Sequence, residues 1–317
     1  MPSQTEAGKA FEYALLIEIN EILGTHQTIT IREDDCFNIA ENCYGQFDEM
    51  EKSNYKKAVI AAIEHLLDLE PRLENPLDSN DLLELQIVPD SQGIQGDVRD
   101  ILVIRSRQQW EIGLSAKNHH RAVKHSRLSD SIDFGNDWLE NDCSEIYFNS
   151  ISPIFSELRN LRTNGELWRN LEDKHARFYI PILNAFKTEL LRLDSENPTI
   201  IPGKLLKYLI GNKDFYKIIK GNNITEIQGF NLNGTLNKSI NAFRPRVRVS
   251  KLRLPTRIIE LVYKPNSTDT LILTCDEGWQ ISFRIHNASS RVEPSLKFDI
   301  NLIGHPQSLY SNHISWN

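Results

Sequence analysis

Residues 97–127 read DVRDILVIRSRQQWEIGLSAKNHHRAVKHSR, and this stretch decides the fold. Residues 100–104 are an aspartate followed by an unbroken apolar run, which is typical of a strand buried on both faces. Residues 110–117 alternate instead. Trp110, Ile112, Leu114 and Ala116 point one way, and Glu111, Gly113, Ser115 and Lys117 point the other. The connector, residues 105–109, is too short for a parallel crossover, so the two strands are expected to form an antiparallel hairpin.

The hairpin is expected to bring a carboxylate and an ammonium group into one small site. Because the start of the first strand faces the end of the second, Asp100 should lie opposite a residue between Gly113 and Lys117. Carboxylate oxygens bind divalent cations, and a lysine beside them can position a water molecule and offset phosphate charge. Gly113 and Ser115 share the face of Lys117 and are expected to leave room for a nucleic-acid backbone. The same two charges at strand ends also fit ordinary solvated residues.

Basic side chains are concentrated in two runs. The net charge is −7, but residues 1–100 hold 21 acidic and 7 basic side chains, whereas the other 217 residues hold 22 and 29. The first run contains Lys117, Arg121, Lys124 and Arg127, interleaved with His119, His120 and His125. The second contains Arg244, Arg246, Arg248, Lys251, Arg253 and Arg257. Either run alone fits a solvated surface, but two runs, one beside the proposed active site, favour DNA contact.

Other chemistries find little support in the sequence. His119 and His120 have no second ligand pair at zinc-finger spacing, so phosphate or base contact is the better interpretation. Walker and Rossmann glycine motifs do not occur. The four cysteines lack CxxC spacing and are expected to be free thiols. There is no basic and apolar leader and no apolar run of membrane-spanning length, so a cytoplasmic protein without membrane contact is expected.

Three stretches resemble the HaeIII-type restriction endonucleases, a branch of the PD-(D/E)xK nucleases. The longest runs from GDVRDILV through WEIGLSAKNHHRAVKHSRLSDSIDFGNDW. GKAFEYALL, residues 8–16, is similar to the opening helix of the family, and FRIHNASSRVEPSLKFDI, residues 283–300, is similar to its C-terminal segment. The resemblance covers the whole chain. It implies a type II endonuclease that needs Mg2+ and cuts double-stranded DNA, with GGCC as the implied target.

The resemblance assigns two site residues and leaves a third open. Asp100 matches the metal-binding aspartate of the family, and Lys117 matches the lysine of its (D/E)xK element. The acidic position two residues before that lysine is Ser115 here. Glu111 lies about 20 Å along the strand from Lys117 and is too distant to replace that acid. The substitutes considered are Glu12, Asp97, Asp130 and Asp133, and Glu12 is favoured.

The C-terminal segment also offers candidate DNA contacts. Arg284 and His286 alternate with Phe283 and Ile285, so one face of a strand would be polar. Without a family resemblance, a half-solvated strand is the favoured interpretation of this pattern. With the resemblance, Arg284, His286 and Asn287 become candidate base or phosphate contacts.

The remaining pattern predicts an α/β fold. Helices are expected over residues 8–23, 49–69, 130–163 (broken near Pro153), 175–195 and 202–210, and strands over 28–32, 82–88, 258–263, 270–275, 279–285 and 296–303. This predicts a restriction-endonuclease-like mixed sheet core flanked by helices, with a β-rich basic C-terminal region. We expect residues 1–200 to form the catalytic region and residues 201–317 the DNA-recognition region, although the two could be one compact unit.

The functional expectation is a type II site-specific deoxyribonuclease that cleaves a short palindrome by metal-assisted hydrolysis and leaves 5′-phosphates. A palindrome favours symmetric action, by a homodimer or by successive nicks from a monomer. A companion DNA methyltransferase acting on the same site is expected as well. Two alternatives stay open: a non-catalytic DNA-binding protein of the same fold, suggested by Ser115, and a repair nuclease that recognises DNA structure.

Overall fold

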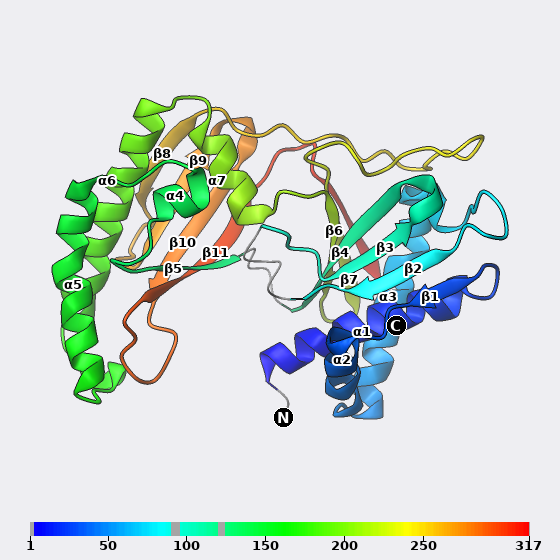
Figure 1. Ribbon diagram of the computed structural model, residues 1–317, viewed down its shortest axis with the longest axis horizontal. Coiled ribbons are helices and arrows are strands. Elements are labelled where there is room, and N and C mark those ends of the chain that lie inside the picture. The colour runs from blue at the N-terminus through cyan, green and yellow to red at the C-terminus, as the bar shows by residue number, and fades with distance from the viewer. Residues whose placement is uncertain (1–2, 90–95, 120–123, 317) are drawn as a thin grey trace. The chain divides into compact units, whose positions relative to one another are not determined.

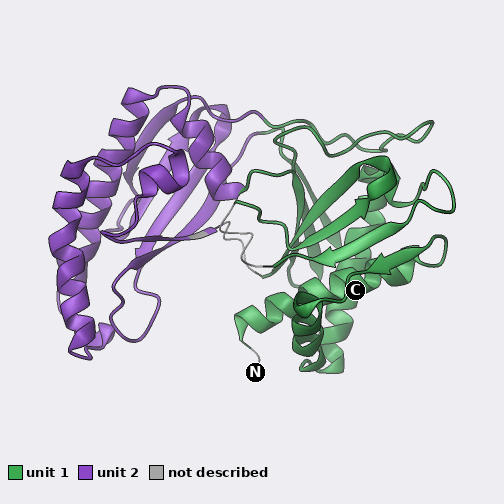
Figure 2. Cartoon of the chain, viewed as in Figure 1, with its two compact units in different colours: residues 1–121, 211–252, 307–317 green, residues 122–210, 253–306 purple. Residues whose placement is uncertain are grey.

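The computed structural model describes residues 3–89, 96–119 and 124–316 (Figure 1). These residues form two compact units, each made of segments that alternate along the chain (Figure 2). Unit 1 contains residues 1–121, 211–252 and 307–317, and unit 2 contains residues 122–210 and 253–306. The expected assignment of residues 1–200 to catalysis and 201–317 to recognition stays a prediction.

Unit 1 is built on a mixed seven-stranded sheet. Its order is β1 (Ile29–Ile31), β2 (Leu83–Ile87), β3 (Ile101–Arg105), β4 (Trp110–Asn118), β6 (Phe215–Lys220), β7 (Ile224–Phe230) and β12 (Tyr310–Ser315). The pairs β1/β2 and β4/β6 are parallel, and the other neighbours are antiparallel. The predicted hairpin is confirmed as β3 and β4, joined by the 3₁₀ turn η3 (Ser106–Gln108), with Ile101 opposite Leu114.

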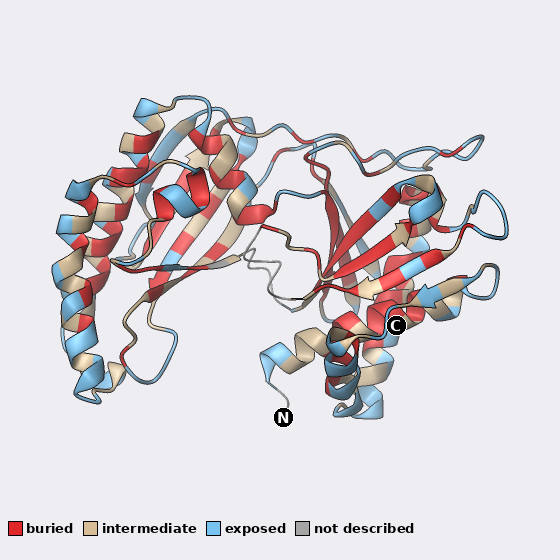
Figure 3. Cartoon of the chain, viewed as in Figure 1, coloured by how far each residue is buried: buried red, intermediate tan, exposed pale blue. Residues whose placement is uncertain are grey.

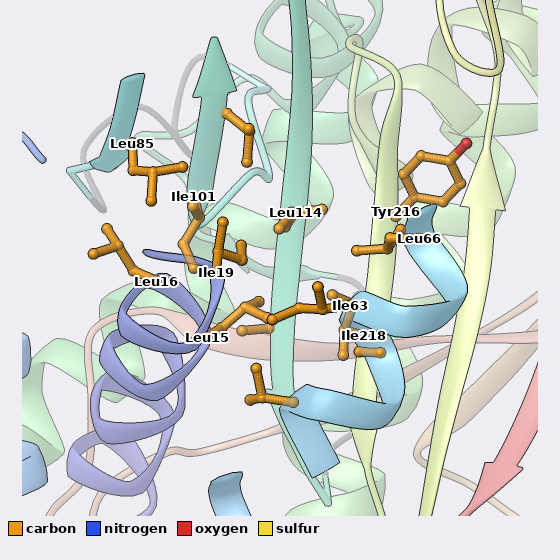
Figure 4. Packing of buried hydrophobic residues seen from close by; sticks show 14 of the residues in the cluster. Leu15, Leu16, Ile19, Ile63, Leu66, Leu85, Ile101, Leu114, Tyr216 and Ile218 are labelled. Atoms are coloured by element: carbon orange, nitrogen blue, oxygen red, sulfur yellow. The ribbon is translucent and has the colours of Figure 1, made fainter. Parts of the chain in front are cut away.

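The described residues of unit 1 form the helices α1 (Gln4–Leu23), α2 (Asp35–Gly45) and α3 (Glu49–Leu69). Helix α1 begins at a capping box in which Ser3 and Glu6 satisfy each other's backbone N–H groups. The apolar stripes of α1 and α3 pack on the sheet, as Figure 4 shows for Leu15 and Ile63 beside Leu114. The 3₁₀ turn η1 (Pro71–Leu73) follows α3. The apolar side chains of α1 and α3 face Leu114 and Ala116 of β4. Gly113, Ser115 and Lys117 therefore lie on the opposite face of that strand.

Unit 2 is built on an antiparallel five-stranded sheet. Its order is β5 (Lys124–Leu128), β11 (Leu296–Gly304), β10 (Gln280–His286), β9 (Thr270–Cys275) and β8 (Ile258–Tyr263). Its helices are α4 (Phe134–Leu139), α5 (Glu145–Thr163), α6 (Ile180–Glu196) and α7 (Ile201–Ile210), with the short turns η4 (Trp168–Asn170) and η6 (Asp276–Gly278) and a π-helical turn η5 (His175–Tyr179). Phe283 and Phe298 on the apolar face of the sheet pack against Phe186 of α6.

The observed fold confirms the predicted α/β class, and most of the predicted helices and strands are present. One prediction was wrong: Pro153 lies inside α5, and the break in residues 130–163 falls at residues 140–144, between α4 and α5. A proline removes one helical hydrogen bond, and the packed flanks of α5 tolerate that loss here. Buried residues are concentrated in the strands and on the inner faces of the helices (Figure 3). In the described part of the chain, no helix combines the length and apolar character needed to cross a membrane.

Candidate active site

Asp100 is fixed at the point where three strands of the large sheet meet. Its backbone N–H donates to Leu114 O of β4 at 2.8 Å, and its carbonyl accepts from the N–H of Val88 at 2.9 Å, just after β2. Its Oδ2 atom accepts from Ser115 Oγ at 3.1 Å, from the backbone N–H of Ala116 at 2.7 Å and from Lys117 Nζ at 2.9 Å. The predicted proximity of Asp100 and Lys117 is therefore confirmed.

Glu12 contributes a second carboxylate from α1, which packs against β4. Only 6% of the residue is exposed, and its Oε2 atom accepts from Lys9 Nζ at 2.9 Å. Burial raises the pKa of Glu12 to about 8, and the negative charge of Asp100 adds to this, whereas the charges of Lys9 and Lys117 oppose it. Among the four acids considered as substitutes, Glu12 is thus the one that shares an electrostatic environment with Asp100 and Lys117.

Ser115 occupies the place of the usual second acid. It is buried, carries no charge and donates to Asp100. Lys217 of β6 is its registered neighbour on the adjacent parallel strand, and this lysine is also buried. Sequence reasoning missed Lys217. The aromatic and β-branched residues of FYKIIK are typical of a strand, but nothing local shows that the strand pairs with β4.

The space beside Gly113 is filled by protein. A Cβ atom at Gly113 would lie 1.9 Å from Cδ of Arg99, so the arginine side chain runs directly over the glycine. Arg99 binds both oxygens of Asp97, at 2.8 and 2.7 Å, and Oε1 of Glu111 at 2.6 Å. The expectation that Gly113 leaves room for a nucleic-acid backbone was therefore wrong, and Asp97 is part of an ion-pair network with Arg99 and Glu111.

The other two candidate acids have structural partners in unit 2. Asp130 forms a two-pronged ion pair with Arg159, at 2.6 and 2.8 Å. Asp133 caps α4 by accepting from the N–H of Asn136 at 3.0 Å, and it also accepts from the N–H of Cys143 at 3.1 Å. Both carboxylates are thus engaged in organising the segment around α4.

The donor set at Asp100 suits a hard divalent cation. Asp100 and Glu12 supply carboxylate oxygens, and the Ser115 hydroxyl lies beside them. Within residues 3–89, 96–119 and 124–316, no group of three histidine, cysteine or acidic side chains is arranged as a metal centre. A cation here would therefore have to complete its coordination with water or substrate oxygens, as Mg2+ commonly does. A buried glutamate whose pKa is raised partly by a neighbouring aspartate is consistent with such a cation.

The first basic run divides between the two units. In unit 1, the backbone N–H of His119 donates to Lys220 O at 2.9 Å, and its Nε2 lies 3.3 Å from Lys220 Nζ. Burial lowers the pKa of His119, and the charge of Lys220 lowers it further. Arg121 and the side chain of His125 lie outside the described residues.

In unit 2, strand register gathers cations on the polar face of the sheet. Arg127 of β5 lies opposite Lys297 of β11, which lies opposite His286 of β10. Two residues along each strand, His125 pairs with Asp299, and Asp299 pairs with Arg284. Asp299 lies 3.3 Å from Arg284 Nη2 and 3.6 Å from His286 Nδ1. We call this set, namely Arg127, Arg284, His286 and Lys297, the polar sheet face.

The polar sheet face joins candidates that are more than 150 positions apart in the sequence. Arg127 binds Glu293 at 3.1 Å and Ser295 Oγ at 2.9 Å, and about 40% of its side chain stays exposed. Lys297 was missed by sequence reasoning because its pairing with Arg127 depends on register. Arg284 is more exposed than His286, and burial lowers the pKa of His286.

Two predicted DNA contacts have clear internal partners. Lys124 donates to Tyr208 O at 3.0 Å and lies 3.5 Å from the Tyr208 ring centroid, and burial lowers its pKa to about 8. Asn287 holds the following turn, because its Nδ2 donates to Ser289 O and Arg291 O and its Oδ1 accepts from the N–H of Glu293.

The second basic run also divides between the units, because residues 244–251 belong to unit 1 and Arg253 and Arg257 belong to unit 2. Arg244, Arg246 and Arg248 are all exposed in an irregular segment. Arg246 is tied to α3, because its backbone N–H donates to Asp68 O and its Nη1 lies 2.8 Å from Asp68 Oδ1.

A mixed sheet whose hairpin joins an aspartate to a lysine, with a buried glutamate from a covering helix, is the arrangement expected of a metal-dependent nuclease. The comparisons with known proteins agree. The HaeIII restriction endonuclease family matches residues 8–306. The type II restriction enzyme HaeIII from Haemophilus aegyptius is 42% identical over 311 residues, which is 98% of this chain and 97% of that enzyme. No solved structure matches the chain. The chain therefore belongs to the HaeIII restriction endonuclease family and is a type II restriction endonuclease, a DNA-binding hydrolase.

Proposed function

We propose that Asp100, Glu12 and Lys117 form the catalytic site of this endonuclease. The observation that carries the proposal is the convergence on Oδ2 of Asp100, which accepts from Lys117 Nζ at 2.9 Å and from two further donors of β4. The buried Glu12 carboxylate responds to the same charges. These three side chains come from α1, the start of β3 and the end of β4, so the folded unit 1 is needed to assemble them.

Asp100 and Glu12 would hold the metal ion, and we propose Mg2+ as that ion. When bound, Mg2+ polarises a scissile phosphate and lowers the pKa of a water molecule. Lys117 would orient the attacking water and offset charge that develops on the phosphate. The water oxygen forms a bond to phosphorus, the bond to the 3′ oxygen breaks, and the 3′ oxygen takes up a proton, which leaves a 5′-phosphate. Ser115 keeps Asp100 oriented by donating to the oxygen that Lys117 also contacts.

The proposed substrate is a short palindrome in double-stranded DNA, GGCC, as in the family resemblance. The polar sheet face supports a role in DNA contact, because it presents three cations, Arg127, Arg284 and Lys297, on one side of a sheet. Arg244, Arg246 and Arg248 are further candidates for phosphate contact. We infer that a homodimer or successive nicking by a monomer would cut both strands, and that a methyltransferase for the same sequence would protect the host DNA.

The test is a digest of a sequenced plasmid with the purified full chain, with Mg2+ or with EDTA. Discrete fragments that map to GGCC and appear only with the metal are expected. Lys117→Ala should cut at least about 100-fold more slowly while a gel shift shows retained DNA binding. Lys57→Ala, an exposed lysine on α3, is the matched control and should cut like the parent.

Three results would overturn parts of the proposal. Equal cutting by the parent and Lys117→Ala would remove Lys117 from the mechanism. Binding by the parent without any cutting would favour the non-catalytic alternative and point to Ser115. Cutting that follows DNA structure and yields no discrete fragments would favour the repair nuclease.

A further inference from the structure

Unit 2 contains a cavity that the catalytic proposal does not use. Its volume is about 780 Å³, within the range of about 300–1,000 Å³ that is typical of small-molecule sites. The aromatic part of its lining is called the aromatic wall here and the polar part the polar wall, and Asp173 and Lys174 also line the cavity. Trp168, His175 and Tyr179 belong to the aromatic wall, and Asp269, Arg284 and His286 belong to the polar wall.

A local irregularity of the backbone builds the aromatic wall. The π-helical turn η5 precedes α6 and carries both His175 and Tyr179, whose ring centroids lie 5.2 Å apart in an edge-on arrangement. Turns of this kind are rare and are often found at functional sites. Trp168 lies 5.7 Å from Tyr179, and its backbone N–H donates to Ser290 O at 2.9 Å. The indole is half-buried and lines the cavity, with Lys174 Nζ 6.0 Å from its ring centroid, so a base would stack on the part of the ring that this ammonium leaves open.

Hydrogen bonds fix the groups of the polar wall. Asp269 accepts from Ser267 Oγ and from Thr270 Oγ1, both at 2.7 Å. Arg284 is held by Asp299, yet about 55% of its side chain remains exposed. His175 Nδ1 lies 2.8 Å from Thr268 Oγ1. The wall therefore offers a carboxylate acceptor and a guanidinium donor whose positions are set before any ligand binds.

We propose that this cavity binds the base of a nucleotide, stacked on Trp168 and recognised at its edge by Asp269 and Arg284. Every base has a π face that stacks on an aromatic ring, and every base edge carries hydrogen-bonding groups that a carboxylate and a guanidinium can pair with. A mainly apolar ligand would leave Asp269 and Arg284 desolvated without new partners, at a cost in affinity. A free anion such as phosphate would gain nothing from the aromatic wall.

The base could come from a free nucleotide or from a strand whose base is unstacked, and the chemistry is the same for both. Arg284 and His286 belong both to the cavity and to the polar sheet face, which connects the cavity to the surface proposed for DNA. Only the DNA source rests on the proposed function. Base binding itself needs neither Asp100 nor a metal ion.

The experiment uses 2-aminopurine deoxyriboside monophosphate, a fluorescent nucleotide whose emission falls when its base stacks, with the full chain in EDTA. The parent should quench the probe in a saturable way. Trp168→Ala should weaken binding by about 5- to 150-fold, which corresponds to the loss of one stacked base. Trp168→Phe keeps an aromatic ring and should bind more tightly than Trp168→Ala.

Arg284→Ala is a second variant at an exposed position, so its binding can be interpreted even if Trp168→Ala proves unstable on heating. It should also weaken binding of the probe. Lys117→Ala should bind the probe like the parent, so that a failure of the catalytic proposal and a failure of the base site give different results. No saturable quenching by the parent, or quenching unchanged in both Trp168→Ala and Arg284→Ala, would overturn the inference.

Competition distinguishes the two sources. A GGCC duplex and the four natural deoxynucleoside monophosphates are added separately to the complex of parent and probe. Displacement by the duplex supports a base that comes from DNA. Displacement by mononucleotides without displacement by the duplex supports a free nucleotide as the ligand.

Discussion

Gly113 has no side chain, and this leaves room for the side chain of Arg99 to pack on β4. Arg99 crosses this position and then reaches Asp97 and Glu111, so a methyl group at residue 113 would displace the arginine and weaken both ion pairs. We expect Gly113→Ala to lower the free energy of unfolding by about 1–3 kcal/mol, as is typical of overpacking in a filled site. Denaturant unfolding followed by circular dichroism measures the change.

The matched control is Gly8→Ala in α1. A Cβ atom at Gly8 meets nothing within 4 Å, and alanine favours helix more than glycine does. Its free energy of unfolding should therefore equal or exceed that of the parent by up to about 1 kcal/mol. If Gly113→Ala were as stable as Gly8→Ala, Arg99 would have to leave the surface of β4 at no cost, and the account of this site would be wrong.

Glu70 makes the stability of unit 1 depend on pH. It is fully buried, and its Oε1 accepts from Tyr216 Oη at 2.7 Å and from the N–H of Asn237 at 2.6 Å. Burial raises its pKa from 4.5 to about 7, although these hydrogen bonds act in the opposite direction. Between these two values the folded protein binds the proton more tightly than the unfolded chain does, so the contribution of Glu70 to stability falls as pH rises from about 4.5 to about 7.

Comparison of the parent with Glu70→Gln isolates this contribution. The difference between their unfolding free energies should change by no more than about 1.4 kcal/mol per pH unit within the window and should be flat above it. Glu64→Gln, at an exposed position of α3, the helix that ends just before Glu70, is the matched control. A difference between parent and Glu70→Gln that does not vary with pH would mean that Glu70 titrates as it does in the unfolded chain.

Individual site residues differ in how far the sequence could predict them. Asp100 and Lys117 could be paired because a short hairpin leaves few registers, and register brings the ends of its strands together. Glu12 could be proposed only by resemblance, because its position depends on how α1 packs on β4. Lys217 could not be proposed at all, since the β4/β6 pairing joins residues about one hundred positions apart.

Among the elements, β5 is a charged strand that the sequence pattern does not predict. Its residues KHSRL are mostly polar or basic, and their pattern predicts only a basic run in contact with DNA. In the fold they form the edge of the five-stranded sheet beside β11. The strands β6, β7 and β12 were also missed. By contrast, α1 and α3 could be predicted closely, because a 3.6-residue apolar period depends only on neighbours in the sequence.

The register of β5, β11 and β10 leads to a prediction about salt dependence. If Lys297 contacts a DNA phosphate beside Arg127 and His286, Lys297→Ala should reduce the slope of log K against log salt by up to about 0.9. Lys207→Ala, exposed on α7 in the same unit, is the matched control and should leave the slope unchanged. Fluorescence anisotropy of a labelled duplex, without metal, measures both. Equal slopes for parent, Lys297→Ala and Lys207→Ala would exclude the polar sheet face as a phosphate contact.

On the scale of the whole molecule, each of the two units is made of separate stretches of one chain. The chain leaves unit 1 after residue 121, returns at residue 211, leaves again after residue 252 and returns at residue 307. Acidic residues 1–100 and basic residues 211–252 therefore share unit 1, although they differ in sequence position and in charge. Composition along the chain could not predict this division, because each unit is completed by strands that lie far apart in the sequence.

Because unit 1 includes residues 211–252 and 307–317, we predict that residues 1–200 do not fold alone. Such a fragment contains the proposed catalytic residues but lacks β6, β7 and β12, three strands of the seven-stranded sheet. Strand β4 would become an edge, and the core around α1 and α3 would lose Tyr216, Ile218 and Ile227. Loss of three such core side chains costs more than the about 5–15 kcal/mol by which a protein of this kind is stable, once the lost strand pairings are included.

The fragment should show no cooperative thermal unfolding and no cleavage of a GGCC plasmid with Mg2+, while the full chain, prepared identically, shows both. Adding residues 201–317 as a separate chain is the control. It supplies β6, β7 and β12 without restoring chain continuity, and so shows whether the fragment is inactive because these strands are absent or because it is irreversibly misfolded. Recovery of activity on mixing would support a catalytic unit that needs both segments of the chain. Cooperative unfolding and cutting by residues 1–200 alone would instead establish a contiguous catalytic region, and the strands β6, β7 and β12 would then be dispensable for holding Asp100, Glu12 and Lys117 together.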